Sequence, residues 1–449
     1  MSNKDKQSFN RLLYLLEKYL DGKIVNLTHQ DRNNSFIFHY YHEIIRYWNK
    51  INYILKKTLR ISNQLSIKKE KKALFFYSLY RILFEQVSVK DLMRELNIKK
   101  SQKNIFSSIF TRINTFSWEI ALKNKSDKEK LSITEAIPTF FIDHLLHPGV
   151  MDFNFLRENI LAMNNIEKNR LYLRVNAFEQ ETRYKIIRDL IKDLKYRAIA
   201  LIQDKEIPEL YHVPHHKKRQ ILKGKPYLEG KIIFQDKASV AVVNILSPHP
   251  EDYIYDMCAA PGNKTSLIAQ YSNNQARIIA GDFNSTRILS AKTLLSKLDA
   301  SNFYLLNTDG IEDPFRSPNL FDKILLDAPC TGSGSFLTNP ELKWRQSESF
   351  LYMTTTLQEK LIESAINLLN PNGILVYSVC SFYPEEGELQ ISKFLSRLRP
   401  LPLPDWLSSC YNLKVLGLDD SNFTGMGRLF PSVHQTQGFF IGKFKKKEK

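Results

Sequence analysis

Cysteine is scarce in this chain, and its spacing argues against two classes of site. The 449 residues include four cysteines, Cys258, Cys330, Cys380 and Cys410, and no two of them form a C-x-x-C pair. Such spacing supports neither a zinc ribbon nor a dense disulfide framework. We therefore expect no metal site, and we expect the protein to work in a reduced, cytoplasmic compartment.

Long apolar runs are also missing. Residues 1–7 lack the apolar core of a signal peptide, and the longest apolar run, near Leu74, is interrupted by Arg81. It is far too short for a membrane span, so we expect no membrane partner. Apolar residues nevertheless make up 43% of the chain, which is enough to build the cores of two or three domains.

Glycine does not occur between Gly22 and Gly149. Over this part of the chain apolar residues recur at spacings of three and four, as in Phe75, Leu79 and Ile82, which is typical of amphipathic helices. The pattern predicts a helical domain over residues 1–130, with basic residues on its outward faces, including Lys56, Lys57 and Arg60.

Acidic residues are too few in the first half of the chain to balance the basic ones. Residues 1–240 hold 44 Lys and Arg against 26 Asp and Glu, whereas the remaining residues hold 20 against 21. The net charge of +17 therefore belongs to the front of the chain. A surplus of this kind favours a nucleic acid as partner, because phosphate contacts release counterions.

A second domain is predicted after the charged, apolar-free stretch 123–130. Strand patterns at 171–175 and 231–234 enclose a helix pattern at 183–194, so residues 131–235 are expected to form a small α+β module that recognises RNA. The stretch 212–219 holds three histidines but no cysteine or carboxylate at ligand spacing. We interpret it as a solvated basic loop that can contact phosphate.

Strand and helix patterns alternate over residues 236–449, which predicts an α/β domain with a largely parallel, doubly wound sheet. The predicted strands are 253–257, 277–281, 303–306, 321–326, 374–378 and 439–444, and the predicted helices are 287–298, 351–369 and 387–398. Ligands of such sheets bind beyond the carboxyl ends of the strands. The basic tail 443–449 is expected to be frayed.

The stretch 253–265 is the candidate cofactor site. A short apolar strand ends at Asp256, a loop with Pro261 and Gly262 follows, and a helix pattern begins near Asn263. The loop is a poor match to a P-loop, which needs Gly directly before the Lys, and to a dinucleotide fingerprint, which needs three glycines. An ordinary strand-to-helix turn is the remaining alternative.

Acidic residues follow four of the predicted strands: Asp256, Asp282, Asp309 and Asp327. Asp282 lies about 20 residues beyond the glycine loop, where a carboxylate hydrogen-bonds the hydroxyls of a ribose. Asp309 is placed to accept from an adenine amino group. Each alone could be a helix cap or a turn residue.

Two cysteines come just after predicted strands. Cys330 lies in Asp327-Ala-Pro-Cys-Thr-Gly-Ser-Gly334, and Cys380 lies in Tyr377-Ser-Val-Cys-Ser381. An arbitrary free cysteine is more often a small buried apolar residue than a nucleophile. Here both are expected at the ligand-binding edge of the sheet, which favours a chemical role.

These motifs resemble the signatures of the RsmB/NOP/Sun family of RNA (cytosine-5) methyltransferases. The resemblance extends over about residues 135–445 and also includes residues 171–176, 235–239, 340–344, 384–386, 428–431 and 438–440. The helical front resembles the NusB-like domain of the ribosomal-RNA members of the family. The family implies a Rossmann-like methyltransferase domain.

The resemblance implies S-adenosyl-L-methionine as cofactor. The residues that would bind it are Cys258, Ala259, Ala260, Pro261, Gly262, Asn263, Lys264, Asp282, Arg287, Asp309 and Asp327. It also implies Cys380 as nucleophile and Cys330 as the residue that assists release. Lys264 could lower the pKa of Cys380, and Asp327, if protonated, could donate to N3 of cytosine. Ribosomal RNA is the expected substrate, transfer RNA the alternative, and we expect a monomer.

Three residues depart from the family's usual pattern. Val379 stands where Thr usually precedes the nucleophile, Gly387 where Asn is common, and Gln437 where Asp often occurs. Because Val379 could alter the activation of Cys380, a catalytically inactive RNA-binding factor remains a rival interpretation. A DNA cytosine-C5 methyltransferase, with Cys330 as its nucleophile, is another.

Overall fold

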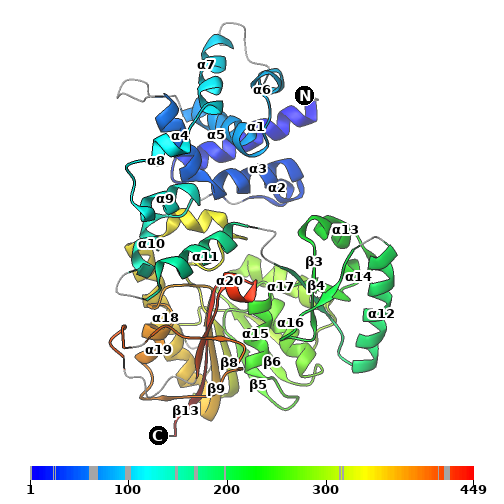
Figure 1. Cartoon of the computed structure of the whole chain (residues 1–449). Coiled ribbons are helices and arrows are strands. Elements are labelled where there is room, and N and C mark those ends of the chain that lie inside the picture. Colours follow the sequence, from blue (N-terminus) through cyan, green and yellow to red (C-terminus); the bar gives the residue numbers. More distant parts are fainter. Residues whose placement is uncertain are drawn as a thin grey trace. The chain divides into compact units, whose positions relative to one another are not determined.

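The computed structural model describes residues 3–23, 25, 27–59, 69–96, 103–146, 150–165, 170–196, 199–312, 315, 318–412, 414–418 and 425–448. The chain forms two compact units. The first comprises residues 1–143 together with 338–344, and the second comprises residues 144–337 and 345–449 (Figure 1).

The first unit is helical, as the spacing of apolar residues predicts. Its helices are α1 (Asn3–Leu20), α2 (His29–Asn33), α3 (Ser35–Arg46), α4 (Trp48–Leu59), α5 (Lys69–Phe84), α6 (Val89–Glu95), α7 (Lys103–Asn114), α8 (Trp118–Leu122), α9 (Asp127–Thr134) and most of α10 (Thr139–Leu146). Leu12, Ile44 and Leu79 are fully buried in one core. Lys56 and Lys57 are exposed, and Arg60 lies outside the described residues.

Seven residues from the second half of the chain complete this unit. Residues 338–344 belong to it, and most of them form the 3₁₀ helix Pro340–Arg345. The Trp344 indole donates a hydrogen bond to the Ile45 carbonyl at 2.7 Å, and the Lys343 ammonium donates to the Arg46 carbonyl at 3.3 Å. Lys343 is fully buried, and this burial lowers its pKa well below the ordinary value.

Only the first half of the charged stretch 123–130 lies between helices, because α9 begins at Asp127. Ser126 and Glu129 form a capping box that starts α9, so the predicted boundary at 130/131 falls inside a helix. The charges fit this position because the first turn of a helix favours acidic residues and faces water. The division between the two compact units follows at 143/144.

The second unit begins with a small antiparallel sheet after α11 (Phe153–Asn164). Its strand order is β2-β3-β1-β4, and its elements are β1 (Leu171–Val175), α12 (Gln180–Tyr196), β2 (Ile202–Gln203), β3 (Leu210–Val213), α13 (Lys218–Leu222), α14 (Lys225–Leu228) and β4 (Ile232–Phe234). Leu173, Val175 and Val213 pack with α12, whereas Tyr172 and Leu210 pack into the core of the large sheet. Both faces of the small sheet are therefore covered.

The large sheet has nine strands in the order β11-β12-β13-β9-β8-β5-β6-β7, with β10 paired to β13. Five are parallel neighbours: β5 (Tyr253–Asp256), β6 (Arg277–Asp282), β7 (Phe303–Asn307), β8 (Phe321–Asp327) and β9 (Leu369–Val379). The antiparallel strands are β10 (Leu398–Pro400), β11 (Ser408–Ser409), β12 (Met426–Leu429) and β13 (Phe439–Lys446). The predicted Rossmann-like α/β architecture is confirmed.

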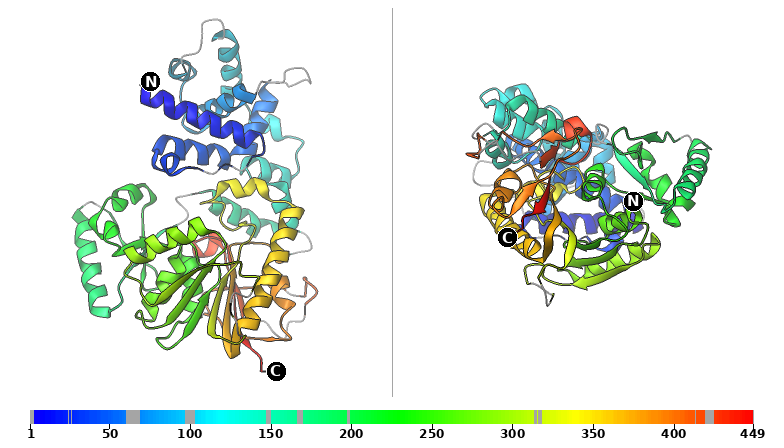
Figure 2. Two further views of the ribbon diagram at one scale, coloured as in Figure 1. Left: turned by 180° about the vertical axis from the view of Figure 1, so that it is seen from behind. Right: turned by 90° about the horizontal axis from the view of Figure 1, so that it is seen from below.

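Helices cover both faces of this sheet. α15 (Lys237–Leu246) and α16 (Asn263–Tyr271) pack on one face and α18 (Glu348–Leu368) packs on the other, while α17 (Ser285–Lys297) follows β6. Figure 2 shows α18 in yellow running beside the strands. Among the residues that the structure describes, no helix is long and apolar enough to cross a bilayer.

Two sequence-based expectations near the C-terminus are wrong. The helix expected over 387–398 is α19 (Glu388–Ser392) only, because Leu398 begins strand β10. The tail expected to be frayed from Lys443 instead continues β13 to Lys446, because Phe444 is buried and Lys446 donates to the Leu369 carbonyl at 2.6 Å. Lys449 lies outside the described residues.

The second unit also contains a pH-sensitive ion pair. His144 Nε2 lies 2.9 Å from Glu385 Oε1, and the imidazole packs edge-on against the Tyr383 ring. The hydrogen bond to Glu385, with a further contribution from Glu348, raises the pKa of His144. A raised pKa means that the folded state binds a proton more tightly than the unfolded state.

We expect Glu385→Gln to lose stability mainly at low pH. The wild-type advantage is fully present below the unfolded His pKa, about 6.5, and disappears as the pH rises through the raised folded pKa. Because both side chains are partly exposed, the difference should stay under about 1 kcal/mol. Melting temperatures of both proteins between about pH 5 and pH 9 test this on either side of the His titration. A gap that is constant with pH would contradict it.

Candidate active site

The parallel pairing of β8 and β9 sets the geometry of the site. Asp327, the last residue of β8, lies opposite Ser378 near the end of β9. The loops carrying Cys330 and Cys380 therefore leave the sheet side by side. β5 is the neighbour of β8 on its other side, and the order of connections reverses between these two strands. Such a switch point is where open α/β sheets bind ligands.

The glycine loop lies between β5 and α16. Gly262 has φ +101°, a conformation that side chains other than glycine's rarely adopt, and a Cβ there would lie 3.3 Å from the Ala291 Cβ. Asp256 is fully buried, and its Oδ2 accepts a hydrogen bond from Thr265 at 2.7 Å. Burial raises the pKa of Asp256 to about 7. Its Oδ1 is buried without a hydrogen-bond partner.

Asp282 and Arg287 form the next part of the site. The Asp282 carboxylate accepts hydrogen bonds from the Ala260 and Asn284 amides at 3.2 and 3.0 Å. Arg287 lies 3.3 Å from the same carboxylate and also donates to the Ala260 carbonyl. The structure therefore brings the predicted ribose-binding carboxylate against the glycine loop.

Asp309 lies on the loop after β7. Its Oδ1 accepts from the Ile311 amide at 3.1 Å, which shapes the loop, and the neighbouring Thr308 amide donates to the Asp282 carbonyl at 3.2 Å. The next residue, Gly310, lies close to Met257 and Leu361. Asp282 and Asp309 thus follow two adjacent strands, as the sequence predicts.

Asp327 is held by two donors. Lys264 Nζ lies 2.5 Å from Asp327 Oδ2, and Ser378 Oγ donates to Asp327 Oδ1 at 2.7 Å. Burial lowers the pKa of Lys264, but the Asp327 carboxylate outweighs it and raises that pKa above the ordinary value. Lys264 therefore stands beside Asp327 as an ammonium cation. The sequence analysis did not identify Ser378 as a partner of Asp327.

The two cysteine sulfurs, Cys330 Sγ and Cys380 Sγ, are 3.3 Å apart. The hydrogen bond to Cys380, together with burial, raises the pKa of Cys330 well above the ordinary value. Cys330 is therefore suited to remain a thiol and donate to its neighbour. Burial likewise raises the pKa of Cys258 in the glycine loop, which fits a packing role better than a nucleophilic one.

A buried polar network fixes the two cysteine loops. The Glu386 carboxylate accepts from the Thr331 amide and hydroxyl at 2.9 and 2.6 Å and from Gln358 at 2.9 Å. The Gly334 amide donates to the Cys380 carbonyl at 2.9 Å, and a Cβ on Gly334 would lie 2.0 Å from the Gly438 carbonyl oxygen. The network therefore links the loop after β8 to the residue that carries the second sulfur.

A buried ion pair supports the segment that follows Cys380. Arg428 is almost fully buried and donates to both oxygens of Glu388 at 2.7 and 2.5 Å and to the Ser381 carbonyl at 3.0 Å. Hydropathy patterns alone place such an arginine on the surface, so sequence reasoning gave it no role. At Gly387 a Cβ would lie 2.9 Å from Arg428 Nη2, so Arg428 fills the space that a larger residue would need.

The structure also places Val379. Its side chain is fully buried in the apolar core with Leu361 and Phe440. Successive residues of a strand point to opposite faces, so a hydroxyl at position 379 would enter this core and not approach the Cys380 sulfur.

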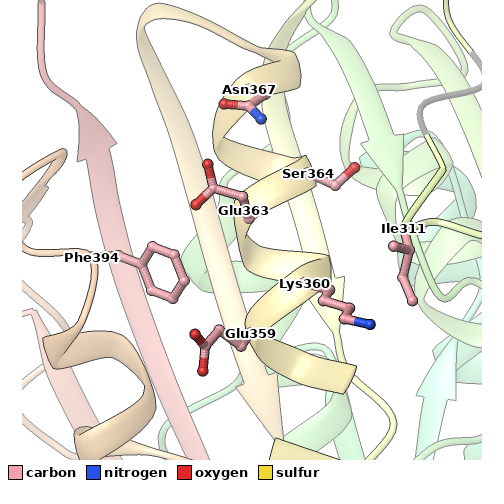
Figure 3. Close-up of a pocket in the computed structure, with 7 residues that line it drawn as sticks. All are labelled: Ile311, Glu359, Lys360, Glu363, Ser364, Asn367 and Phe394. Carbon is pink, nitrogen blue, oxygen red and sulfur yellow. The ribbon is translucent and has the colours of Figure 1, made fainter. Parts of the chain in front are cut away.

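A groove on the outer side of α18 is separate from this site. It has a volume of about 380 Å³, and Figure 3 shows Lys360 and Ser364 pointing towards Ile311, with Glu359 and Glu363 on the side of Phe394. None of the predicted site residues lines it.

Comparison with known proteins finds one family that resembles most of the large α/β domain. Residues 243–445 match the family described as 16S rRNA methyltransferase RsmB/F. A "Probable ribosomal RNA small subunit methyltransferase B" of Synechocystis sp. is 35% identical over 222 residues, 49% of each chain. The 26S rRNA (cytosine-C(5))-methyltransferase nsun-1 of Caenorhabditis elegans is 33% identical over 58% of this chain and 40% of its own. The chain thus spans half or less of the length of these relatives.

Solved structures resemble a larger part of the chain. A methyltransferase homologue from Pyrococcus horikoshii is 28% identical, with a TM-score of 0.59, over 72% of this chain and 99% of its own. The structure titled PH0851 shares the fold with a TM-score of 0.73 at 24% identity, over 92% of this chain and 90% of its own. These structures share the fold of the chain, and residues 243–445 are the part that matches the RsmB/F family.

Proposed function

We propose that the protein is an S-adenosyl-L-methionine-dependent RNA methyltransferase that forms 5-methylcytosine. The observation that carries the proposal is the pair of cysteine sulfurs 3.3 Å apart at the ends of β8 and β9, beside the Lys264–Asp327 ion pair. The match of residues 243–445 to the RsmB/F family supports the same reaction class.

The residues around the glycine loop fit the cofactor. The glycine conformation at Gly262 lets the backbone approach a ligand closely, α16 directs its N-terminus at the loop, and Asp282 offers carboxylate oxygens to ribose hydroxyls. Asp309 is assigned to the adenine. When bound, S-adenosyl-L-methionine supplies an electrophilic methyl group. Arg287 contacts both Asp282 and the Ala260 carbonyl. It therefore holds in place the Asp282 carboxylate that would bind the ribose.

Cys380 is the nucleophile in this proposal. C5 of cytosine is too weak a nucleophile to take a methyl group directly, so the Cys380 thiolate first forms a bond to C6 and the C5=C6 electron pair becomes available at C5. C5 takes the methyl group, and a base then removes the C5 proton. The electrons of that C–H bond restore C5=C6 as the Sγ–C6 bond breaks. The raised pKa of Cys330 supports this division of roles, since Cys330 stays a thiol that can donate a proton to the other sulfur.

Asp327, Lys264 and Cys330 handle protons in this scheme. Asp327 binds the edge of the base, and the Lys264 ammonium, held at 2.5 Å, stabilises the charge that develops on the ring. Donation to N3 of cytosine by a protonated Asp327 stays a prediction. Cys330, the neighbouring thiol, donates a proton as Cys380 leaves.

Ribosomal RNA is the proposed substrate. The named relatives act on small-subunit and 26S ribosomal RNA, and the positive charge is concentrated in residues 1–240, where it can contact RNA phosphates. A target cytosine would enter from a single-stranded or opened segment, because the site lies beyond the strand ends and a paired base cannot reach it. Transfer RNA is the alternative. Bisulfite sequencing of RNA from a strain lacking the protein tests both, because 5-methylcytosine resists the conversion to uracil. The RNA in which one or more protected cytosines become convertible is the substrate.

Cysteine substitutions test the division of roles. Cys380→Ala should abolish methyl transfer from labelled S-adenosyl-L-methionine, because no covalent bond to C6 can form. Cys330→Ala should accumulate a covalent protein–RNA adduct, seen as a band of reduced mobility on a denaturing gel, because release is impaired.

Cys380→Ala combined with Cys330→Ala is the matched control and should show no such band. The opposite pattern, with activity lost only in Cys330→Ala, would indicate the arrangement of a DNA cytosine-C5 methyltransferase. A gel without an adduct under turnover conditions would contradict the release role of Cys330.

Val379→Thr tests the inactive-factor rival. Because the side chain faces the apolar core, the variant should lose about 1–3 kcal/mol of stability, the cost of burying an unpaired hydroxyl. Its kcat per folded molecule should stay within about twofold of wild type, since each tenfold rate change needs about 1.4 kcal/mol at the transition state. Val379→Ala is the control for packing. A large gain in activity on introducing the hydroxyl would show that position 379 limits the wild-type enzyme.

A further inference from the structure

The connection between β3 and β4, residues 214–231, has an uneven charge. It contains six basic residues and one acidic residue, Glu229. Of the basic side chains, those at Lys218, Arg219, Lys223, Lys225 and Lys231 belong to exposed residues. Glu229 lies 2.8 Å from Lys231 and 3.5 Å from Lys225, so this one carboxylate is shared by two of the cations. The segment therefore keeps a strong local positive charge.

The small sheet cannot present an open face to RNA. Residues on one face of β1 pack against α12, and Tyr172 on the other face packs in the core with α15 and α16. Reading of bases by stacking on an exposed sheet, as in RRM domains, needs a free face. Contacts between this module and a nucleic acid must therefore use its helices and connections.

The surface of α12 and the β3–β4 connection differ in charge. The 17 residues of α12 (Gln180–Tyr196) hold five basic and three acidic residues, whereas the β3–β4 connection holds six and one. A cavity of about 440 Å³ beside α12 is lined by Arg183 and Tyr184, but Arg183 lies 4.0 Å from the Glu209 carboxylate. The α12 side is thus the less basic of the two, and the β3–β4 connection is the surface that better suits a polyanion.

The β3–β4 connection is also fixed to the domain that carries the site. Asn176 Nδ2 donates to the Gly230 carbonyl at 3.0 Å and to the Leu298 carbonyl, just after α17, at 2.9 Å. Lys297 of α17 lies over the Tyr227 ring, 4.1 Å from its centroid. A second tie comes from Arg174, which donates to Ser266 and Gln270 of α16. α16 begins at the glycine loop, and α17 begins three residues after Asp282. A phosphate bound to the β3–β4 connection therefore has a fixed position relative to the glycine loop and to Asp282.

We propose that the β3–β4 connection binds the phosphate backbone of the substrate RNA. The inference rests on the proposed function, because it takes RNA to be the substrate. Arg219, Lys223 and Lys225 act as point charges that hold the strand without reading its sequence, while the bases remain free for the cysteine loops.

A charge-reversal triple tests the proposal. The variant Arg219→Glu/Lys223→Glu/Lys225→Glu changes exposed residues and no residue of the proposed catalytic or cofactor site. The matched control, Lys185→Glu/Arg188→Glu/Lys192→Glu, makes the same change in net charge on exposed residues of α12. Binding of the full-length proteins to an unmodified 16S rRNA transcript is measured without cofactor across a salt series.

The β3–β4 triple should weaken binding by roughly tenfold or more, and the salt slope of log K should fall by roughly 2 to 3, one counterion term for each lost contact. The control triple should bind within about twofold of wild type. Equal weakening by both triples would show that only the net charge of the protein matters. Unchanged binding by the β3–β4 triple would show that this surface does not contact the RNA. Either result overturns the proposal. Equal competition by duplex DNA against wild type would also overturn it, because the segment would then be a general polyanion site.

Failure of the proposed function gives a different result. In that case wild type transfers no methyl group to any RNA, whereas the binding comparison is still measured. Affinity for S-adenosyl-L-methionine should be the same in wild type and both triples, which shows that the folded cofactor site is retained.

Discussion

The hydrogen-bonded register between β8 and β9 is the constraint on which the rest of the site depends. Because Asp327 lies opposite Ser378, the chain leaves both strands at the same edge, and two sulfurs 50 residues apart in sequence come within 3.3 Å of each other. A slip of one residue would turn Cys380 to the other face. The buried cores on both faces of the sheet oppose such a slip. It would move Tyr377 and Val379 out of the core in which they pack and to the opposite face of the sheet.

Buried polar groups next to the two cysteine loops fix the positions of these loops. Glu386 and Glu388 are both fully buried, yet each has donors for its carboxylate: Thr331 and Gln358 for the first, Arg428 for the second. Buried charges are costly unless paired, so these groups tolerate little displacement. Thus the loops that carry the cysteines are held by hydrogen bonds whose loss is expensive, while Lys264 and Asp327 keep part of their surface open to a ligand.

Sequence patterns predicted the elements that obey simple periodicity. The central strands, α17, α18 and the acidic residues at strand ends follow from alternation of apolar runs. The short loop motifs contain Lys264, which the structure brings to Asp327. Patterns did not predict buried charges such as Arg428, Arg174 and Lys343, because hydropathy assigns charged side chains to the surface. Nor could they show that residues 338–344, about 200 residues downstream of the helical front, belong to its core.

The segment 338–344 limits how the helical unit can be exchanged for another one. The indole of Trp344 and the ammonium of Lys343 both end on main-chain carbonyls of α3, Ile45 and Arg46. Main-chain acceptors are present whatever the side chains are, so the helical front can vary widely in sequence while the geometry of this docking is kept. A graft that replaced residues 1–143 would have to reproduce the path of one helix end, and not any particular side chain, to receive the segment.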